Sequence, residues 1–259
     1  TAAGISGFSF NPGNELRYLG YNDTLESGLI NAPVADKTDT LQFAMGIPCP
    51  GMPIVNYEGK AYKTVQIYNQ CWFKENINVG TMIQGDEPMH HDGEIEKYCF
   101  GDHPDSCLKY GGLYRWDEMM KYTTQEGTKG ICPPGWHIPD DGEWNILEGS
   151  TDYHHPIGDP IWTNIGYRGF DTGMKLKTTL YWMNNGNGSN ASGFSVLPAG
   201  YCINGGTFQA NTWGGYFWTS SQYLQDYPYC RILECIEDRV SHNWITKTNA
   251  YPVRCLRDY

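Results

Sequence analysis

The segment 131–147, ICPPGWHIPDDGEWNIL, constrains the fold of this chain more than any other part of it. A Pro-Pro-Gly turn is followed by a short apolar stretch, then by Asp140, with Glu143 at the third position after it. This is the capping-box spacing, so it predicts that a helix begins after Asp140. Trp144 and Leu147 would lie on one face of that helix. Loops that carry catalysis rarely combine these features, and the segment therefore predicts a rigid corner of the scaffold.

The composition excludes several classes of partner. The chain has 259 residues, enough for one large domain or two small ones, and a formal net charge of −11 with no run of Lys or Arg. Nucleic acid and anionic membrane surfaces are bound through clustered cations, so we expect neither as a partner. No apolar run approaches the roughly 18–20 residues that span a bilayer. Because the chain starts at Thr1, we expect a processed or trimmed form.

The cysteines indicate an oxidising compartment. None of the nine forms a Cys-x-x-Cys pair, which argues against zinc-ribbon and thioredoxin-like proteins. Scattered cysteines in an acidic chain rich in Tyr, Trp, Gly and Asn instead predict disulfides in an extracellular or cell-surface protein. Cys99 and Cys107 flank a short turn-forming loop, FGDHPDS, so we expect a local disulfide between them. The odd count leaves at least one thiol unpaired within the chain.

The hydrophobic pattern divides the chain into an N-terminal arm and a main domain. Residues 1–46 are too polar for a core of their own, and they are either an assembly or anchoring arm or a linker. The main domain, 47–259, is predicted as α+β, with two helices and short antiparallel strands. The predicted helices are 113–122 and the one after Asp140. A hairpin is predicted around 57–60, strands at 70–76, 194–201, 216–220, 229–235 and 253–256, and mostly loop at 80–98 and 150–192.

Several motifs resemble, in order and spacing, the Fibrobacter succinogenes major paralogous domain of Bacteroidetes and Fibrobacteres. They are CPGMPIV at 49–55, YKTVQIYNQCWFKENINV at 62–79, CLKYGGLYRWDEMM at 107–120, ICPPGWHIPDDGEW at 131–144, GFSVLPAGY at 193–201, YFWTSS at 216–221 and VRCLRD at 253–258. The resemblance covers 49–258 and leaves residues 1–46 outside. It implies a secreted or surface-displayed protein without established catalytic activity.

This domain in turn resembles the C-type-lectin-like fold of formylglycine-generating enzymes, where a helix also opens with Pro-x-x-x-Glu-Trp, as at Pro139, Glu143 and Trp144. The family pattern carries Cys49 and Cys71, which bracket the predicted hairpin. The lectin-like fold returns its C-terminal strand beside earlier elements, which implies a long-range disulfide between Cys132 and Cys255. The resemblance thus implies a disulfide-stapled C-type-lectin-like domain, and the pairing of Cys202, Cys230 and Cys235 stays open.

Cys230 and Cys235 also suggest an enzymatic alternative, because two cysteines at this separation resemble the active-site pair of formylglycine-generating enzymes. Such chemistry needs a reactive thiolate. The flanking sequence does not match that motif, and the nearby acidic residues Glu234, Glu237 and Asp238 would raise a thiol pKa. A structural disulfide between the two is the favoured interpretation, and a cysteine-dependent oxidase is the weakest of the functional hypotheses.

A metal site is weakly indicated. His90, His91 and Asp92 lie among Asp86, Glu87, Glu94 and Glu96, and such oxygen ligands suit calcium. The spacing matches no defined calcium loop, and acidic residues in a solvated loop are the commoner case. We therefore expect no cofactor and assign no metal ligand, with calcium left open. No Ser, His and Asp set marks a catalytic site.

Aromatic residues of the last third predict a ligand-binding surface. Tyr and Trp among small polar residues give rigid amphipathic contact area, and flat rings beside amides and carboxylates suit sugars. Trp218 lies in a motif strand and is assigned to the core. The candidate ligand residues are Tyr223, Asp226, Tyr227, Arg231, Asn243 and Trp244. The alternative is a tyrosine-rich surface without a ligand.

Two short motifs of the arm predict modification. Asp23-Thr24-Leu25 and Asp39-Thr40-Leu41 resemble the sequence that Bacteroidetes O-glycosylate, so Thr24 and Thr40 are candidate sites. The leading functional hypothesis is a structural or adhesive surface protein that assembles with itself, as a filament or surface-layer subunit. The alternative is a module that binds a glycan or a protein through the aromatic loops.

Overall fold

The computed structural model describes residues 16–21, 26–31 and 46–258, and the chain divides into two units, Thr1–Met45 and Gly46–Tyr259. The boundary after Met45 lies next to the predicted one after Gly46. In the first unit, β1 (Leu16–Tyr21) pairs antiparallel with β2 (Glu26–Asn31), from Leu16 opposite Asn31 to Tyr21 opposite Glu26.

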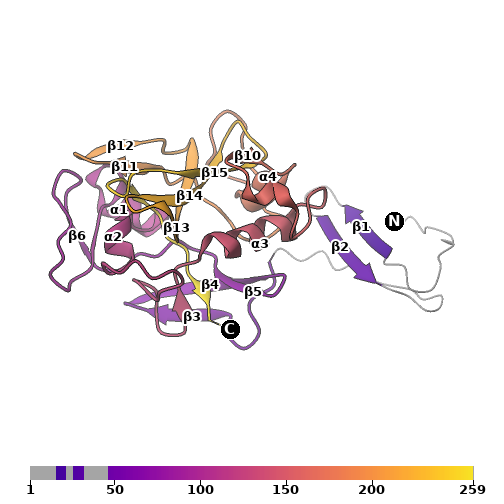
Figure 1. Cartoon of the computed structure of the whole chain (residues 1–259), viewed down its shortest axis with the longest axis horizontal. Coiled ribbons are helices and arrows are strands. Elements are labelled where there is room, and N and C mark those ends of the chain that lie inside the picture. The colour runs from indigo at the N-terminus through magenta and orange to yellow at the C-terminus, as the bar shows by residue number, and fades with distance from the viewer. Residues whose placement is uncertain (1–15, 22–25, 32–45, 259) are drawn as a thin grey trace. The chain divides into compact units, whose positions relative to one another are not determined.

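One sheet of the second unit joins the start of the domain to its end. Its strand order is β3-β4-β5-β17-β9. The strands are β3 (Ile54–Tyr57), β4 (Lys60–Ile67), β5 (Gln70–Phe73), β17 (Leu256–Arg257) and β9 (Trp136–His137). The predicted hairpin is confirmed, with Tyr57 opposite Lys60. The C-terminal strand lies between β5 and β9, so elements from both ends of the domain share one sheet (Figure 1).

A second sheet, of order β10-β15-β14-β13, carries the longest strand of the described ranges, β13. Its strands are β10 (Gly166–Arg168), β15 (Val240–Trp244), β14 (Tyr227–Glu234) and β13 (Gly214–Leu224). A third sheet of short strands has the order β12-β11-β16-β8, and a parallel pair joins β6 to β7. Their bounds are β12 (Thr207–Gln209), β11 (Tyr201–Ile203), β16 (Ala250–Tyr251), β8 (Tyr114–Arg115), β6 (Thr81–Met82) and β7 (Glu96–Lys97).

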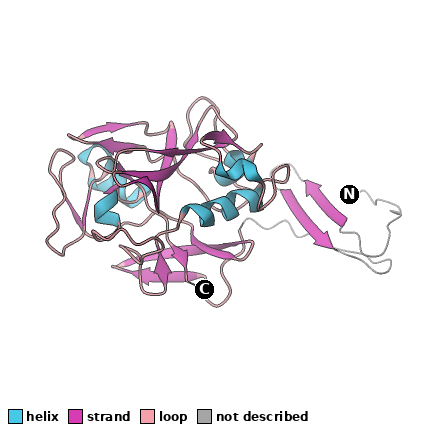
Figure 2. Ribbon diagram, viewed as in Figure 1, coloured by secondary structure: helices cyan, strands magenta, loops and turns pink. Residues whose placement is uncertain are grey.

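The helices are short, and strands and loops dominate the domain (Figure 2). The α-helices are α1 (Pro104–Tyr110), α2 (Trp116–Met119), α3 (Asp141–Thr151) and α4 (Thr172–Leu176), with 3-10 turns η1 (Phe100–Asp102) and η2 (Pro160–Thr163). The predicted capping box of α3 is confirmed. Asp140 Oδ1 accepts from the Glu143 N–H at 2.8 Å, and Glu143 Oε2 accepts from the Asp140 N–H at 2.9 Å.

Helix α3 lies between the first two sheets, where its apolar face fills the core (Figure 1). The Trp144 ring is 5.2 Å from that of Trp72 on β5 and 5.3 Å from that of Phe217 on β13. A second apolar cluster lies on the far side of β13, where the buried Trp218 stacks on Tyr251 at 4.4 Å. The prediction that Trp144 and Trp218 belong to the core is confirmed.

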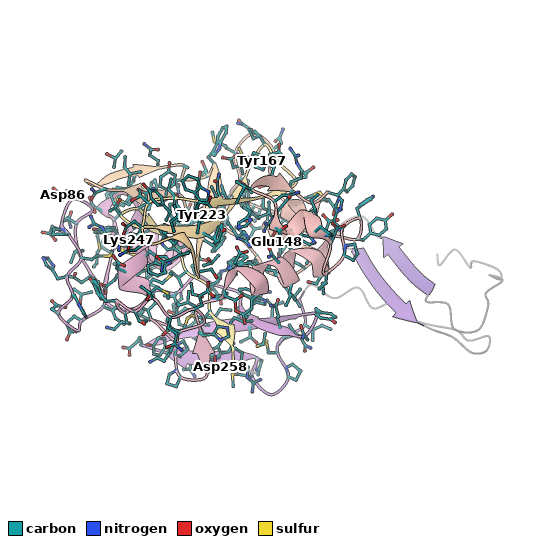
Figure 3. The ribbon with its side chains drawn as sticks, in the orientation of Figure 1. Asp86, Glu148, Tyr167, Tyr223, Lys247 and Asp258 are labelled. Carbon is teal, nitrogen blue, oxygen red and sulfur yellow. A yellow bond between two sulfur atoms is a disulfide. The ribbon has the colours of Figure 1, made fainter. Side chains whose placement is uncertain are left out.

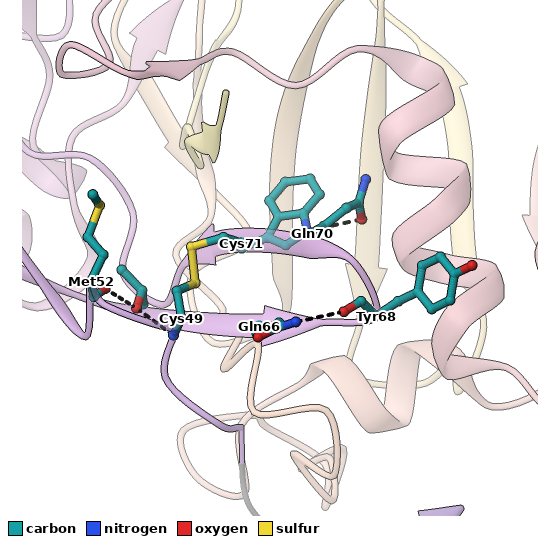
Figure 4. Close-up of a disulfide and its surroundings, with 8 residues drawn as sticks. Cys49, Met52, Gln66, Tyr68, Gln70 and Cys71 are labelled. Atoms are coloured by element: carbon teal, nitrogen blue, oxygen red, sulfur yellow. Dashed lines mark hydrogen bonds between the residues drawn. A yellow bond between two sulfur atoms is a disulfide. The ribbon is translucent and has the colours of Figure 1, made fainter. Parts of the chain in front are cut away.

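Three disulfides join the pairs expected from the sequence: Cys49–Cys71, Cys99–Cys107 and Cys132–Cys255. The first ties the segment before β3 to β5 (Figure 4), where the Cys49 N–H also donates to Thr64 Oγ1 at 3.1 Å. The third links the segment before β9 to the residue before β17, across a sequence separation of 123. The domain is thus a disulfide-stapled mixed α/β fold with mostly strands.

The structure corrects several predicted elements. The predicted helix 113–122 is one strand, β8, followed by the single turn α2, because Tyr114 and Arg115 pair with β16. Residues 194–201 are mostly irregular rather than a strand, since Val196 bonds to Leu176 and Gly200 to Gly214 in different segments. Only Leu256 of the predicted strand 253–256 lies in a strand.

Other predictions overlooked short elements. Helix α1 was missed because it begins inside the loop that the Cys99–Cys107 disulfide closes, with Pro104 at its first turn, and ends at Tyr110. The four α-helices of the described ranges therefore exceed the predicted two. The segment 150–192, predicted as mostly loop, also contains η2, β10 and α4, and 80–98 contributes β6 and β7.

Candidate functional site

Exposed aromatic rings gather where the β13–β14 hairpin turns and where β15 ends. We call Tyr223, Tyr227, Tyr229 and Trp244 the aromatic surface. Tyr223 stacks on Trp244 with ring centroids 5.4 Å apart and an interplanar angle of 11°, while Tyr227 meets Trp244 edge-on at 5.5 Å. Strand pairing sets this arrangement, because Tyr229 lies opposite Trp244 in the register of β14 and β15. Tyr223 is 50% exposed, Tyr227 41% and Trp244 39%, so the rings are open to a ligand.

Polar groups at the edge of the aromatic surface form ion pairs. Lys247 Nζ is 3.1 Å from Asp226 Oδ1 and 3.2 Å from Asp117 Oδ2. The Lys247 N–H also donates to the Asp226 carbonyl oxygen, which holds the residues after β15 against the hairpin turn. The predicted residue Asp226 therefore lies beside the predicted rings, as a partner of lysine (Figure 3 labels Tyr223 and Lys247).

Asn243 does not join this surface. It lies opposite Cys230 in the strand register, and its neighbour Trp244 lies opposite Tyr229. Because successive side chains of a strand point to opposite faces of the sheet, Asn243 and Trp244 face different sides. Its Oδ1 instead accepts from the Trp244 N–H at 3.2 Å. Asn243 therefore has a local backbone role at this position.

Arg231 is the clearest correction among the predicted ligand residues, since its side chain is fully buried. Its Nε donates to Glu148 Oε1 at 2.5 Å and its Nη1 to Asp141 Oδ1 at 2.8 Å, both on α3. The two-residue alternation of β14 puts Arg231 on the same face as Tyr229, but closer to the middle of the sheet, where α3 covers it. No local pattern around Arg231 indicates that a helix covers it.

A buried charge network therefore underlies the sheet next to the aromatic surface. Glu148, fully buried on α3, lies between two arginines: Oε1 accepts from Arg231, and Oε2 accepts from Arg168 Nη2 at 2.7 Å. Asn145 Oδ1 accepts from both guanidinium groups at 3.0 Å. With Asp141, the network holds two positive and two negative charges, and this balance offsets the cost of removing them from water.

Burial and pairing shift the pKa values of this network in different directions. Burial lowers the pKa of Arg168 to about 10 despite the favourable charge of Glu148. Burial also acts to lower the pKa of Arg231, but Glu148 and Asp141 outweigh it and raise that pKa. For Asp141, burial acts to raise the pKa, and the charge of Arg231 and the hydrogen bond from His242 lower it well below the usual range.

His242 connects the network to the aromatic surface. Its Nδ1 lies 2.5 Å from Arg168 Nη1 and 3.1 Å from the Asn164 carbonyl oxygen. Nε2 is 2.9 Å from Asp141 Oδ1. Burial is the main cause that lowers the pKa of His242. The centroid of the Tyr229 ring is 4.7 Å from that of the imidazole and 5.9 Å from that of the Tyr223 ring, so the aromatic surface packs on the buried network.

The favoured disulfide between Cys230 and Cys235 was wrong, because both residues and Cys202 are free and buried. Positions 230 and 235 are an odd number of residues apart, so along an extended chain they face opposite sides, about 16 Å from each other. Cys230 packs in the cluster of Trp218, and Cys235 packs in that of Trp144. Burial raises the pKa of Cys230 to about 12 and also raises that of Cys235, conditions that disfavour a thiolate.

The acidic segment around His90 is held by hydrogen bonds of its own. Glu96 Oε2 accepts from the His90 N–H at 2.6 Å, and the His91 ring stacks on Tyr122 at 4.1 Å. Within the described ranges, no group of three or more His, Cys, Asp or Glu side chains is placed to hold a metal ion. Calcium binding stays an untested expectation. The candidate glycosylation sites Thr24 and Thr40 lie outside the described residues.

Comparison with known proteins places the domain in a family. No curated protein and no solved structure matches the chain. Across the described ranges, no helix has both the length and the apolar character needed to cross a bilayer. The family model of the Fibrobacter succinogenes major domain matches residues 65–257, a range that contains the whole buried network and the aromatic surface. The chain therefore belongs to the Fibrobacter succinogenes major domain family.

Proposed function

We propose that this chain is part of a secreted or cell-surface adhesive protein, without enzymatic activity, whose aromatic surface binds a ligand. Three disulfides support the extracellular placement, because such bonds persist in oxidising compartments. The carrying observation is the position of Tyr223, Tyr227 and Trp244: these large rings are 39–50% exposed and gather where the β13–β14 hairpin turns and β15 ends. Exposed aromatic groups that are also rigid give contact area at little cost in side-chain entropy.

A carbohydrate is the ligand class that we favour for this surface. The Tyr223 and Trp244 rings are nearly parallel in a stacked pair, and partly exposed flat rings of this kind suit the C–H side of a sugar ring. Asp226 and Lys247 are paired at the edge, so their charges largely cancel locally and their polar atoms remain as hydrogen-bonding groups. A protein ligand is the alternative, since Tyr and Trp also dominate protein-binding hot spots.

A glycan array with the domain 46–259 and the full chain tests this proposal. The variants are Tyr227→Ala combined with Trp244→Ala, and as a matched control Tyr153→Ala, which removes another ring that is 47% exposed but lies in a different part of the domain. We expect binding by the wild type and the control, and its loss in the double variant. Absence of glycan binding by the wild type, or binding unchanged in the double variant, would count against a carbohydrate ligand.

Self-assembly through residues 1–46 is the second candidate function. The observation that favours it is the small sheet of β1 and β2, because an isolated two-stranded sheet is marginally stable in water and gains stability by packing on another surface. The test is electron microscopy and size-exclusion chromatography of the full chain and of a variant without residues 1–46. We expect the deletion to leave a folded monomer. Identical assembly of the deleted form would refute a role for the arm.

We also propose that the domain is C-type-lectin-like, on the resemblance of its motifs and on the return of β17 beside β5 and β9. An experimental structure compared with lectin-like domains tests this. A different strand order around the Cys132–Cys255 disulfide would contradict it.

A further inference from the structure

The imidazole of His137 lies between two carboxylates, one in the first turn of α3 and the other just after β17. Its Nδ1 is 2.7 Å from Asp258 Oδ1, which follows β17, and its Nε2 is 3.0 Å from Glu143 Oε1 on the first turn of α3. His137 itself is on β9, opposite Leu256 of β17. His137 is 8% exposed, so its ring has little access to water. Asp258 lies far from Tyr223 in Figure 3, so this cluster is separate from the aromatic surface.

Two contacts of this kind determine how many protons the ring carries. An ionised carboxylate only accepts hydrogen bonds, and a neutral imidazole has a single N–H to donate. With one proton on the ring, one of the two nitrogen–oxygen contacts would bring two lone pairs together. Both contacts are satisfied only by the imidazolium, which donates from Nδ1 and Nε2 at once. Short-range geometry therefore identifies His137 as a cation in the folded domain.

The other charged groups on the surrounding elements are two carboxylates with partners of their own and one arginine. From α3, the Asp140 carboxylate caps the helix by accepting from the Glu143 N–H, and Asp141 pairs with Arg231. Glu143 also accepts from the Asp140 N–H, so its carboxylate serves the helix cap and the imidazolium together. From the C-terminal segment, Arg257 lies opposite Trp136 in the register, next to the pair of Leu256 and His137.

We propose that protonated His137 is a pH-sensitive latch that fastens the C-terminal residues 256–258 to the start of α3. Below its pKa the ring holds Asp258 and Glu143 together across β9. When the ring loses a proton, one of the two contacts becomes repulsive and the end of the chain is held by the Asp258 N–H bond to the Gly135 carbonyl oxygen, 2.9 Å long, and by its strand pairing. The Cys132–Cys255 disulfide limits the opening to the residues after Cys255.

The direction of the pKa shift agrees with this geometry. Burial alone acts to lower the pKa of His137, but the hydrogen bonds to Glu143 and Asp258 outweigh burial and raise it. A raised pKa in the folded state means that the stabilisation is complete below the unfolded value of about 6.5 and is lost as pH rises through the folded value. The latch therefore closes on the acid side and loosens on the alkaline side.

Nuclear magnetic resonance of the histidine rings tests the protonation directly, with the signal of His137 assigned from His137→Gln. We expect both ring nitrogens to be protonated on the acid side of the titration, and the pKa of His137 to lie above the usual histidine value of about 6.5. Asp258→Asn should lower that pKa without unfolding the domain, because the Asp258 side chain is 54% exposed. Each unit of change corresponds to a tenfold change in the proton-binding constant. A pKa at or below about 6.5 would overturn the proposal.

Hydrogen exchange and urea unfolding at several pH values distinguish a latch from a purely structural histidine. The protection factor of the Asp258 amide should fall with rising pH in the wild type and stay flat in His137→Gln. The stability difference between these two proteins should shrink over the same pH range. The matched control is His155→Gln, whose ring contacts one carboxylate, that of Asp159 at 3.1 Å. A loss of stability in His137→Gln that is the same at every pH would refute the latch.

Discussion

Removal of the Cys132–Cys255 disulfide should destabilise this domain far more than removal of the Cys99–Cys107 disulfide. The first closes a sequence separation of 123 and the second a separation of 8. A disulfide stabilises mainly by restricting the unfolded chain, by an entropy that grows with the logarithm of the loop length. At 25 °C this relation gives about 4.9 kcal/mol for the long loop and about 2.5 kcal/mol for the short one.

The comparison is well controlled because all four cysteines are buried, with exposed fractions of 0%, 0%, 1% and 3% for Cys132, Cys255, Cys99 and Cys107. Replacing each pair by alanine therefore removes similar buried sulfur atoms in both variants. The packing loss is similar in the two and largely cancels, which leaves a difference of about 2.4 kcal/mol from loop length alone.

Urea unfolding of the two double variants, Cys132→Ala with Cys255→Ala and Cys99→Ala with Cys107→Ala, measures this difference through tryptophan fluorescence. Equal slopes with denaturant would show that both variants expose the same surface on unfolding. Equal losses of stability, or a larger loss for the Cys99–Cys107 variant, would refute the loop-entropy reasoning. That result would place the effect of the long-range disulfide in the folded state.

Three further predictions concern the buried groups. Glu148→Gln should cost about 3–5 kcal/mol in urea unfolding, because it leaves Arg168 and Arg231 short of a buried counter-charge, and a loss under about 1 kcal/mol would contradict the network. Cys230 and Cys235 should resist a thiol reagent in the native protein and react after unfolding, and rapid native labelling would revive the oxidase hypothesis. Because the pKa of Asp141 is lowered in the folded state, its contribution to the free energy of unfolding is present above about pH 4 and is lost as pH falls through the folded-state pKa. Asp141→Asn should therefore flatten the acid end of the profile of stability against pH. An unchanged profile would contradict this.

Local features were predicted well because their causes lie within a few residues. The capping box needs only Asp140 and Glu143, and the hairpin at Tyr57 to Lys60 needs only a turn between two alternating segments. The local disulfide of Cys99 and Cys107 follows from the short loop that they flank. Helix α1 begins within that same loop and was missed, since its seven residues carry too little periodicity to be recognised.

Part of the candidate surface was predicted because some of its residues are close together in the sequence. Tyr223 and Tyr227 lie on either side of one hairpin turn, so their neighbourhood is local. Trp244 joins them through the pairing of β15 with β14. The sequence did not predict this pairing and indicated only that aromatic residues are abundant in the last third of the chain. Asn243 was assigned to the surface although it is next to Trp244 in a strand, because the strand itself was not predicted.

The sequence by itself determined the family, the helix start at Asp140 and the cysteines that form disulfides, because each depends on a local pattern or on a motif that the family shares. Tertiary structure alone decided that Arg231 is buried and that His137 has two carboxylate partners. Arg231 is buried because Glu148, 83 residues earlier in the chain, provides the counter-charge on a helix that covers its sheet. His137 lies between two carboxylates because Asp258, 121 residues later, returns beside β9. Burial and charge depend on such distant partners, and no local pattern records them.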